Sequence, residues 1–207
     1  METKGKFIVF EGIDGSGKTT QMKQLNRYLR EKGIPTHLTA EPTESPFGAQ
    51  LRTCLTGRVE TNEYTIAALF AADRLDHLYN SVNGILKKIY EGVTVLCDRY
   101  YFSSLVYNGS FVSREWVKEL NRPAIEALQP DLVVFIDITG ESAMERVSRR
   151  GETERYESLE KLKNFRNLYM NVFREFPAQK LAVIESDEDK TKTQYKVREA
   201  VDGLFGF

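Results

Sequence analysis

Five short apolar runs recur along the chain, and longer segments with a helical spacing of apolar residues separate them. The runs are FIVF (7–10), THLTA (36–40), VTVLC (93–97), LVVFIDI (132–138) and LAVIE (181–185). Most are continuously apolar, as strands buried on both faces of a sheet are, and THLTA has the weakest pattern. After the first run, Leu25, Tyr28 and Leu29 share a helical face, and Gly33 has the place of a C-terminal cap. The alternation predicts an α/β fold, with a parallel sheet and helices on both of its faces.

The composition is that of one folded domain. Hydrophobic residues make up 41% and charged residues 29% of the 207 residues, and we find no repeat, low-complexity tract or linker. We therefore expect a single domain over residues 1–207. The 29 basic and 30 acidic side chains leave a net charge of -1, so no global field attracts nucleic acid or anionic lipid. The sequence predicts no nucleic-acid partner and no membrane association.

Two further features concern the compartment. Cys54 and Cys97 are far apart and show no CxxC or His-rich spacing, which predicts neither a disulfide framework nor a zinc site. The N-terminal stretch METKGKFIVFEG holds too few consecutive apolar residues for a signal peptide or a membrane span. Together these features favour the reducing cytoplasm.

A phosphate-binding loop follows the first predicted strand. Residues 12–19, GIDGSGKT, fit the pattern G-x-x-x-x-G-K-[ST] without a mismatch, between a predicted strand and a predicted helix. Glycines let the backbone turn tightly and aim its N–H groups inward, and the helix N-terminus adds a favourable dipole. Lys18 then reaches the outer phosphates of a nucleotide, and the Thr19 hydroxyl binds the Mg²⁺ that bridges them. The loop alone names no function, because kinases, motor ATPases and GTPase switches all have one.

Phe70, Arg74 and His77 share one face of a predicted helix in TIAALFAADRLDHL (65–78), because their spacing is i, i+4, i+7. An aromatic ring beside a guanidinium can stack on a nucleotide base and hydrogen-bond its edge. The alternative is that Phe70 belongs to the core and Arg74 pairs with a neighbouring acid. Spacing alone leaves both interpretations open.

Asp98 and Arg99 follow the third apolar run. Ligands of open α/β sheets bind beyond the carboxyl ends of the strands, so these charges lie where a site is expected. Asp98 can hold magnesium through water and Arg99 can clamp a phosphate. The alternative is a surface ion pair at the end of a strand.

Arginines are concentrated in ESAMERVSRRGETERY (141–156), where Arg146, Arg149 and Arg150 lie on adjacent turns and Arg155 follows. Arginines on a closing segment can stabilise the charge of a phosphoryl group in transfer and exclude water. The alternative is a solvated helix in which the arginines pair with the interspersed glutamates.

Taken together, the motifs resemble the thymidylate kinase family, which phosphorylates dTMP to dTDP with ATP. The matching blocks are FIVFEGIDGSGKTTQ, EPT, LFAADRLDH, DRYYFSSLVYNG, PDLVVFID and RVSRRGETER, in the family's order over most of residues 7–156. The resemblance implies the three-layer fold of the P-loop nucleoside monophosphate kinases, with a central five-stranded parallel sheet and a lid segment around 141–156. It also implies ATP and dTMP as substrates, Mg²⁺ as cofactor and a homodimer. Apolar positions of the helical segment 62–91 can serve a dimer interface, although a core helix would look the same.

The resemblance further assigns roles to residues. Phe70 stacks on thymine, Arg74 reaches its carbonyl edge and Arg99 binds the acceptor phosphate. The ATP-binding residues are Gly12, Ile13, Asp14, Gly15, Ser16, Gly17, Lys18, Thr19 and Thr20; the dTMP-binding residues are Asp14, Phe70, Arg74, Arg99, Ser103, Tyr107 and Asn108; the metal-binding residues are Thr19 and Asp98. The catalytic residues are Lys18, Arg99 and the lid arginines Arg149, Arg150 and Arg155, because the phosphate loop has no arginine of its own. Which lid arginine reaches the transferring phosphate stays open.

Two positions depart from the family pattern. Ala40 precedes the Glu-Pro pair where many bacterial members have an arginine, so one contact to the acceptor phosphate is absent or comes from elsewhere. Asn108 replaces the family's usual glutamine at the thymine edge and is one methylene shorter, so its hydrogen bond to the base is longer or passes through water. A pocket that tests one methyl group by apolar contact discriminates by only about 1–3 kcal/mol.

Two rival functions follow from these departures and from one short motif. The first is a kinase of another monophosphate, such as dUMP or UMP. The second is a P-loop NTPase switch, because DITG (137–140) matches the D-x-x-G pattern of switches. The chain has no guanine-reading N-K-x-D motif, which disfavours the switch.

Overall fold

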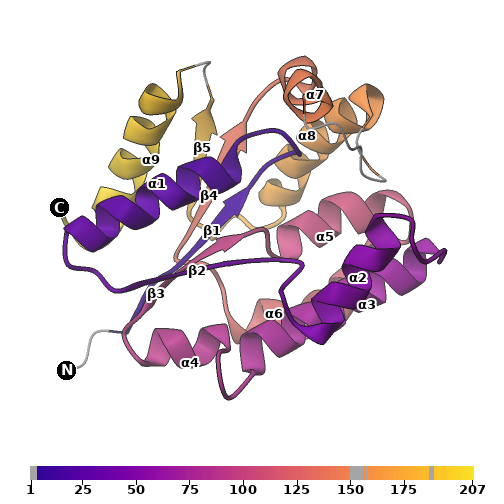
Figure 1. The fold of residues 1–207 in the computed structure, drawn as a ribbon, viewed down its shortest axis with the longest axis horizontal. Helices are drawn as coiled ribbons and strands as arrows, with labels where there is room; N and C mark the ends of the chain where they lie inside the picture. Colours follow the sequence, from indigo (N-terminus) through magenta and orange to yellow (C-terminus); the bar gives the residue numbers. More distant parts are fainter. Residues whose placement is uncertain (1–3, 150–155, 157, 187–188) are drawn as a thin grey trace.

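The computed structural model describes residues 4–149, 156, 158–186 and 189–207, and a five-stranded sheet lies at the centre of this part (Figure 1). The strands are β1 (Phe7–Glu11), β2 (Thr36–Ala40), β3 (Thr94–Asp98), β4 (Leu132–Asp137) and β5 (Leu181–Glu185). All neighbouring strands are parallel, in the order β2-β3-β1-β4-β5. The predicted α/β fold class with a five-stranded parallel sheet is confirmed, and each predicted strand end lies within one residue of the observed one.

Helices connect the strands and cover both faces of the sheet (Figure 1). They are α1 (Lys18–Glu31), α2 (Pro46–Leu55), α3 (Glu63–Tyr79), α4 (Ile85–Tyr90), α5 (Tyr101–Tyr107), the 3₁₀ turn η1 (Asn108–Ser110), α6 (Arg114–Ala127), α7 (Gly140–Ser148), α8 (Leu159–Arg174) and α9 (Lys190–Phe205). The predicted cap at the end of α1 is confirmed, because Gly33 has a φ of 81° and the N–H of Ile34 bonds to the carbonyl oxygen of Leu29.

The predicted continuous helical segment 62–91 is wrong in one respect. The structure divides it into α3 and α4, with a turn between them. The Asn80 side chain accepts a hydrogen bond from the N–H of Val82 at 3.0 Å, which gives the backbone a partner outside the helix. A Cβ on Gly84 would lie 2.5 Å from the carbonyl oxygen of Asn80, so the turn closes too tightly for any other residue.

Alternating side chains of the central strands supply two separate cores. On one face, Ile8 and Phe10 pack with Leu25 of α1 and Val197 of α9. On the other face, Phe7 and Val9 belong to a larger cluster with side chains of α5 and α8. Figure 1 shows the same arrangement, with α1 and α9 on one side of the sheet and α4, α5 and α6 on the other. The result is three layers.

Burial follows the position of each strand in the sheet. The residues of β1 and β3 are all buried, and those of β4 are buried except at its last position. In β2 and β5, at the two edges, most residues are half-buried or exposed. The continuously apolar runs are thus buried on both faces of the sheet in the three central strands, whose carboxyl ends point to the phosphate loop.

Membrane and cysteine features were also predicted from the sequence. Within the described ranges, no helix is long and apolar enough to cross a membrane. Cys54 and Cys97 are both free and buried, so each thiol behaves as a small core residue.

Candidate active site

The loop between β1 and α1 carries glycines that its backbone requires. Gly12, Gly15 and Gly17 have φ values of 147°, 80° and 95°. A Cβ on Gly12 would lie 2.6 Å from the carbonyl oxygen of Ile136, and one on Gly15 would lie 2.6 Å from that of Ala143. The loop is therefore held tightly between β4 and α7, and it leads directly into the N-terminus of α1, where backbone N–H groups favour anions.

Lys18, in the first turn of α1, is buried beneath this loop. Its Nζ donates hydrogen bonds to the carbonyl oxygens of Gly12 (2.9 Å) and Ile13 (3.1 Å). Burial lowers the pKa of Lys18 to about 8, and the positive charge of Arg99 acts in the same direction. An anion bound by the loop would stabilise the charged form of this lysine.

Thr19 and Asp98 provide oxygen atoms that fit a magnesium ion. Thr19 Oγ1 donates a hydrogen bond of 2.6 Å to Asp98 Oδ2, which joins the start of α1 to the end of β3. The other carboxylate oxygen of Asp98 is buried and has no hydrogen-bond partner among the described residues. Mg²⁺ prefers carboxylate, hydroxyl and water oxygens. An unpaired carboxylate oxygen beside a hydroxyl is therefore suited to this ion.

Arg99 follows β3 with a φ of 73°, the one positive value of a non-glycine residue in the described ranges. Such a conformation costs on the order of 1–3 kcal/mol. Its guanidinium pairs with the Asp14 carboxylate and donates to the hydroxyls of Ser103 (3.0 Å) and Tyr169 (3.2 Å). Burial is the largest single influence and lowers the Arg99 pKa, but Asp14 together with Tyr107, Tyr169 and Asp98 outweighs it, so the Arg99 pKa is raised well above its ordinary value. Burial likewise opposes the Asp14 charge, and Arg99 and Lys18 outweigh it, so the Asp14 pKa is lowered.

A pocket opens beside Arg99, and every predicted dTMP-binding residue except Arg74 lines it. Its walls are formed by Asp14, Pro42, Leu55, Phe70, Arg99, Ser103, Ser104, Tyr107, Asn108 and Tyr156. The Tyr107 hydroxyl donates to Asp14 Oδ2 at 3.0 Å, and the Arg99 guanidinium carbon lies 4.9 Å from the centre of the Tyr107 ring. The pocket therefore combines aromatic walls with one fixed cation.

Asn108 has an unusual position in this pocket. Its side chain is buried, yet neither the amide nitrogen nor the amide oxygen has a hydrogen-bond partner within the described part of the chain. An unpaired buried polar group costs about 1–3 kcal/mol. An amide offers both a donor and an acceptor, as the edge of a pyrimidine base requires. The free amide can therefore hydrogen-bond to a polar ligand in the pocket.

Arg74 lies behind the pocket wall. Its side chain is 1% exposed and forms an ion pair of 2.6 Å with Glu41, whose side chain is equally buried. It also donates to Ser104 Oγ at 3.0 Å and to Asn121. The structure thus contains the ion pair between Arg74 and a neighbouring acid that the sequence left open as an alternative. Arg74 contacts Ser104, which lines the pocket, but Arg74 itself does not line it. Direct contact with a base stays a prediction.

His77 completes this buried cluster. Its Nδ1 lies 3.1 Å from Glu41 Oε1, and its Nε2 lies 2.7 Å from Thr39 Oγ1. The Cys97 thiol is near enough for Glu41, His77 and Cys97 to form a group of metal-ligand type, a proximity that sequence spacing does not reveal. Both ring nitrogens are already engaged, and the Arg74 cation faces Glu41. Hydrogen bonding and charge pairing therefore account for the cluster.

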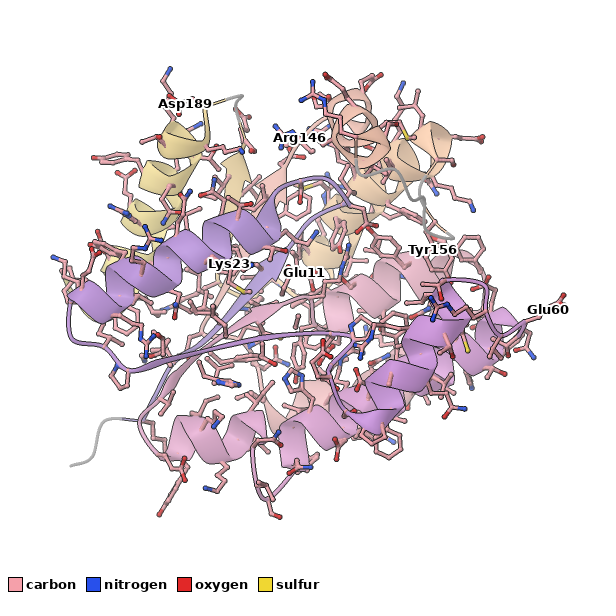
Figure 2. All side chains as sticks on the ribbon, viewed as in Figure 1. Glu11, Lys23, Glu60, Arg146, Tyr156 and Asp189 are labelled. Carbon is pink, nitrogen blue, oxygen red and sulfur yellow. The ribbon has the colours of Figure 1, made fainter. Side chains whose placement is uncertain are left out.

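The arginines of the predicted lid differ in what they contact. Arg149, which directly follows the end of α7, is exposed and pairs with Glu145 of that helix at 2.6 Å. Arg146, one turn earlier in α7, donates to the carbonyl oxygens of Gly15 (3.4 Å) and Ser16 (3.3 Å). Figure 2 shows Arg146 on α7, on the side of the phosphate loop. Of the two arginines of the predicted lid that the structure describes, Arg146 and Arg149, Arg146 is thus the one that hydrogen-bonds to the loop.

A larger cavity of about 510 Å³ lies on this side of the phosphate loop. Arg146, Arg149 and Thr20 line it, together with backbone and side chains of the loop and of α9. Ser16, in the loop, has a buried hydroxyl without a hydrogen-bond partner in the described ranges. The predicted lid residues Arg150 and Arg155 lie outside the described residues.

Glu11 and Tyr169 were not predicted as site residues from the sequence. The contact of Arg146 with the phosphate loop was not predicted either. Glu11 is fully buried and ends an otherwise apolar strand, FIVFE, which was a usable signal because a buried carboxylate needs partners. Tyr169 reaches the site from α8, and nothing in the local pattern distinguishes it from a core aromatic residue.

The parallel sheet, the phosphate loop at the end of its central strand and the cations around that loop define the class of P-loop nucleotide-binding proteins. The family model described as Thymidylate kinase matches residues 10–196. A thymidylate kinase of Akkermansia muciniphila is 37% identical over 207 residues, 99% of this chain and 95% of the relative. One from Caldicellulosiruptor saccharolyticus is 35% identical, over 97% of this chain and 98% of the relative. One from Pelotomaculum thermopropionicum is 42% identical, over 72% of this chain and 70% of the relative. The chain belongs to the thymidylate kinase family.

Proposed function

We propose that this protein transfers the terminal phosphate of ATP to the phosphate of dTMP, which gives ADP and dTDP. The observation that carries the proposal is the pocket beside Arg99, where a cation, the Phe70 ring and the unpartnered Asn108 amide converge. A pyrimidine nucleoside monophosphate offers a partner to each of them. Membership of the thymidylate kinase family supports dTMP as that monophosphate.

In the reaction, an oxygen of the dTMP phosphate attacks the terminal phosphorus of ATP, and the bond from that phosphorus to the bridging oxygen breaks. The protein forms no covalent bond to the phosphoryl group, so its contribution is positioning and electrostatic stabilisation. The loop N–H groups and Lys18 hold the phosphates of ATP, and Arg99 holds the acceptor phosphate. Thr19 and Asp98 would hold Mg²⁺, which offsets phosphate charge when bound.

The lid arginines complete the charge balance. Arg149, Arg150 and Arg155 are assigned this role from the sequence, and we add Arg146 because it already contacts the loop. An arginine placed near the transferring group stabilises charge on its equatorial oxygens.

The acceptor base is recognised by the neutral side chains of Phe70, Asn108 and Ser104. Phe70 stacks on thymine and the Asn108 amide bonds its edge, while Arg74 acts on the base side through Ser104. Tyr107 and Asp14 lie toward the sugar. Ala40 is exposed at the end of β2 and supplies no cation, so Arg99 carries the acceptor phosphate.

The test is coupled ADP release with Mg-ATP and the purified protein, with dTMP, dUMP, UMP, dCMP, dAMP and dGMP at equal concentrations. We expect the highest kcat/KM with dTMP, and partial activity with dUMP because one methyl group is worth about 1–3 kcal/mol. If another monophosphate is turned over faster than dTMP, that monophosphate is the substrate instead of dTMP. ATP hydrolysis that no acceptor changes would favour an NTPase switch over a kinase.

Two further assignments accompany the activity. The family resemblance and the exposed aromatic side chains Phe47, Tyr64 and Trp116 on α2, α3 and α6 support a homodimer. Light scattering after gel filtration decides between one and two copies of the 23.8 kDa chain. Two free, buried thiols agree with action in the reducing cytoplasm.

A further inference from the structure

Below the acceptor pocket, a buried carboxylate contacts the two hydroxyl groups that hold Arg99. Glu11 is the last residue of β1 and lies inside the molecule (Figure 2). Its Oε2 accepts hydrogen bonds from Ser103 Oγ at 2.7 Å and from the Tyr169 hydroxyl at 2.9 Å. The same two hydroxyls accept from Arg99 Nη1. Glu11 and Arg99 therefore share two bridging groups.

The proton count of the hydroxyls gives these bridges a direction. A hydroxyl has one proton to donate and two lone pairs to accept with. Burial raises the pKa of Glu11, and the Arg99 charge and the hydrogen bonds from Ser103, Tyr100 and Tyr169 act against that rise. The Ser103 and Tyr169 oxygens also lie 2.9 Å apart, but the ionised form of Glu11 can only accept, so in that form each hydroxyl directs its proton toward Glu11. Both hydroxyls then present lone pairs to the Arg99 guanidinium. Glu11 thus makes both of them acceptors for Arg99.

Glu11 also fixes the backbone beside Arg99. Its Oε1 accepts from the N–H of Tyr100 at 2.9 Å and from the N–H of Ser103 at 3.3 Å. These groups belong to the start of α5, where no N-cap side chain serves them. Because Tyr100 directly follows the strained φ of Arg99, the carboxylate stabilises the backbone conformation and the side-chain direction of Arg99 together.

We infer that Glu11 and Tyr169 are positioning residues for Arg99, which hold its guanidinium toward the acceptor phosphate and touch neither substrate. Neither residue lines the acceptor pocket. The inference rests on the proposed function, in which Arg99 binds the phosphate of the acceptor. Tyr169 comes from α8, so a helix outside the recognised motifs takes part in the site.

The test removes one hydroxyl, in the variant Tyr169→Phe. The ring stays packed against Phe135 and Phe173, whose ring centres lie 5.1 Å and 5.8 Å away. Affinities for dTMP and for thymidine are measured by titration calorimetry without ATP, because their ratio isolates the contribution of the phosphate. We expect dTMP to bind about fivefold to tenfold more weakly and thymidine to bind as before. In turnover assays, KM for dTMP rises and KM for ATP does not.

Two further variants sharpen the result. Tyr101→Phe is a matched control, because it removes a phenol hydroxyl of a buried tyrosine that donates to Gln129 at 3.0 Å, outside this network. It should leave both affinities unchanged. Glu11→Gln keeps the shape but turns one acceptor into a donor, so it should reduce the dTMP preference more than Tyr169→Phe does. In the double variant Glu11→Gln/Tyr169→Phe, the preference for dTMP over thymidine should be only slightly lower than in Glu11→Gln, because the Tyr169 hydroxyl acts through the same carboxylate.

The outcomes separate the inference from the function. A wild-type protein that binds dTMP no more tightly than thymidine overturns both. A wild-type preference for dTMP that Tyr169→Phe retains overturns the inference alone. An equal loss of dTMP and thymidine binding in Tyr169→Phe also overturns it, because the whole pocket would then have moved. If Glu11→Gln does not fold, Tyr169→Phe decides.

Discussion

Replacement of Arg74 with methionine should destabilise the fold strongly, whatever nucleotide is bound. The side chains of Arg74 and Glu41 are each 1% exposed, and Arg74 directs both Nε and Nη2 at Glu41. Methionine fills a similar volume but leaves the Glu41 charge buried beside His77 alone. Removal of one partner from a buried ion pair costs about 3–5 kcal/mol. For a chain of this size, that corresponds to a fall in melting temperature of roughly 6–20 °C.

The double variant Glu41→Gln/Arg74→Met separates the buried charge from the loss of packing. Uncharged replacements of both partners of a buried ion pair are often tolerated. The free energy of unfolding of the double variant should therefore be at least about 1–2 kcal/mol higher than that of Arg74→Met. Arg122→Met is the control for a lost arginine, because Arg122 is 60% exposed and pairs with the surface glutamates Glu119 and Glu126. Its effect should stay within about 0.5 kcal/mol.

The assay is urea unfolding followed by far-UV circular dichroism, with and without dTMP. If Arg74→Met lowers the free energy of unfolding by less than about 1 kcal/mol, the argument is refuted, because the ion pair would then contribute little to stability. A double variant as unstable as Arg74→Met would also refute it, because the uncompensated Glu41 charge would not be the cause.

Three other predictions concern the phosphate loop and the pocket. Lys18→Ala should lower kcat at least about 100-fold with an unchanged circular dichroism spectrum, whereas Lys23→Ala, exposed on the same helix, should keep wild-type turnover; a folded Lys18→Ala variant with normal kcat contradicts the mechanism. Phe70→Ala should raise KM for dTMP about tenfold with KM for ATP unchanged, and an effect confined to ATP would exclude stacking on the acceptor. The pKa of Lys18 is about 8 in the folded protein and 10.5 as a free side chain, so the unfolded chain binds more protons between these pH values. The unfolding free energy of the wild type relative to Lys18→Met should therefore rise with pH across that window, and a constant difference would show that Lys18 is not desolvated.

Local patterns were enough for most of the fold. Each strand is a short apolar run and the phosphate loop is a contiguous motif, so both can be predicted without knowledge of distant residues. The break between α3 and α4 was missed although NSVNG (80–84) contains ordinary turn residues, because the apolar period continues on both sides of it. The order of the strands depends on pairing over long distances, which no local pattern records.

The candidate site was predictable in its parts and less so in its partners. Phe70, Tyr107 and Asn108 follow from the family motifs, and the structure brings them to one pocket. The contact of Arg74 with Glu41 spans two motifs that the sequence does not connect. Tyr169 is further removed, since its role exists only because α8 packs beside the start of α5.

β1, which precedes the other four described strands along the chain, is the central strand of the sheet. β1 pairs with β3 at residues 95–98 and with β4 at residues 132–135, and it does not pair with β2, the described strand that follows it most closely along the chain. During translation, the segment that carries the phosphate loop therefore has no partner among the described strands until β3 (Thr94–Asp98) has left the ribosome. Its formation depends on long-range contacts, which fold slowly because loop closure precedes the gain from pairing. The apolar run of β1 therefore needs protection from aggregation while the later strands are synthesised.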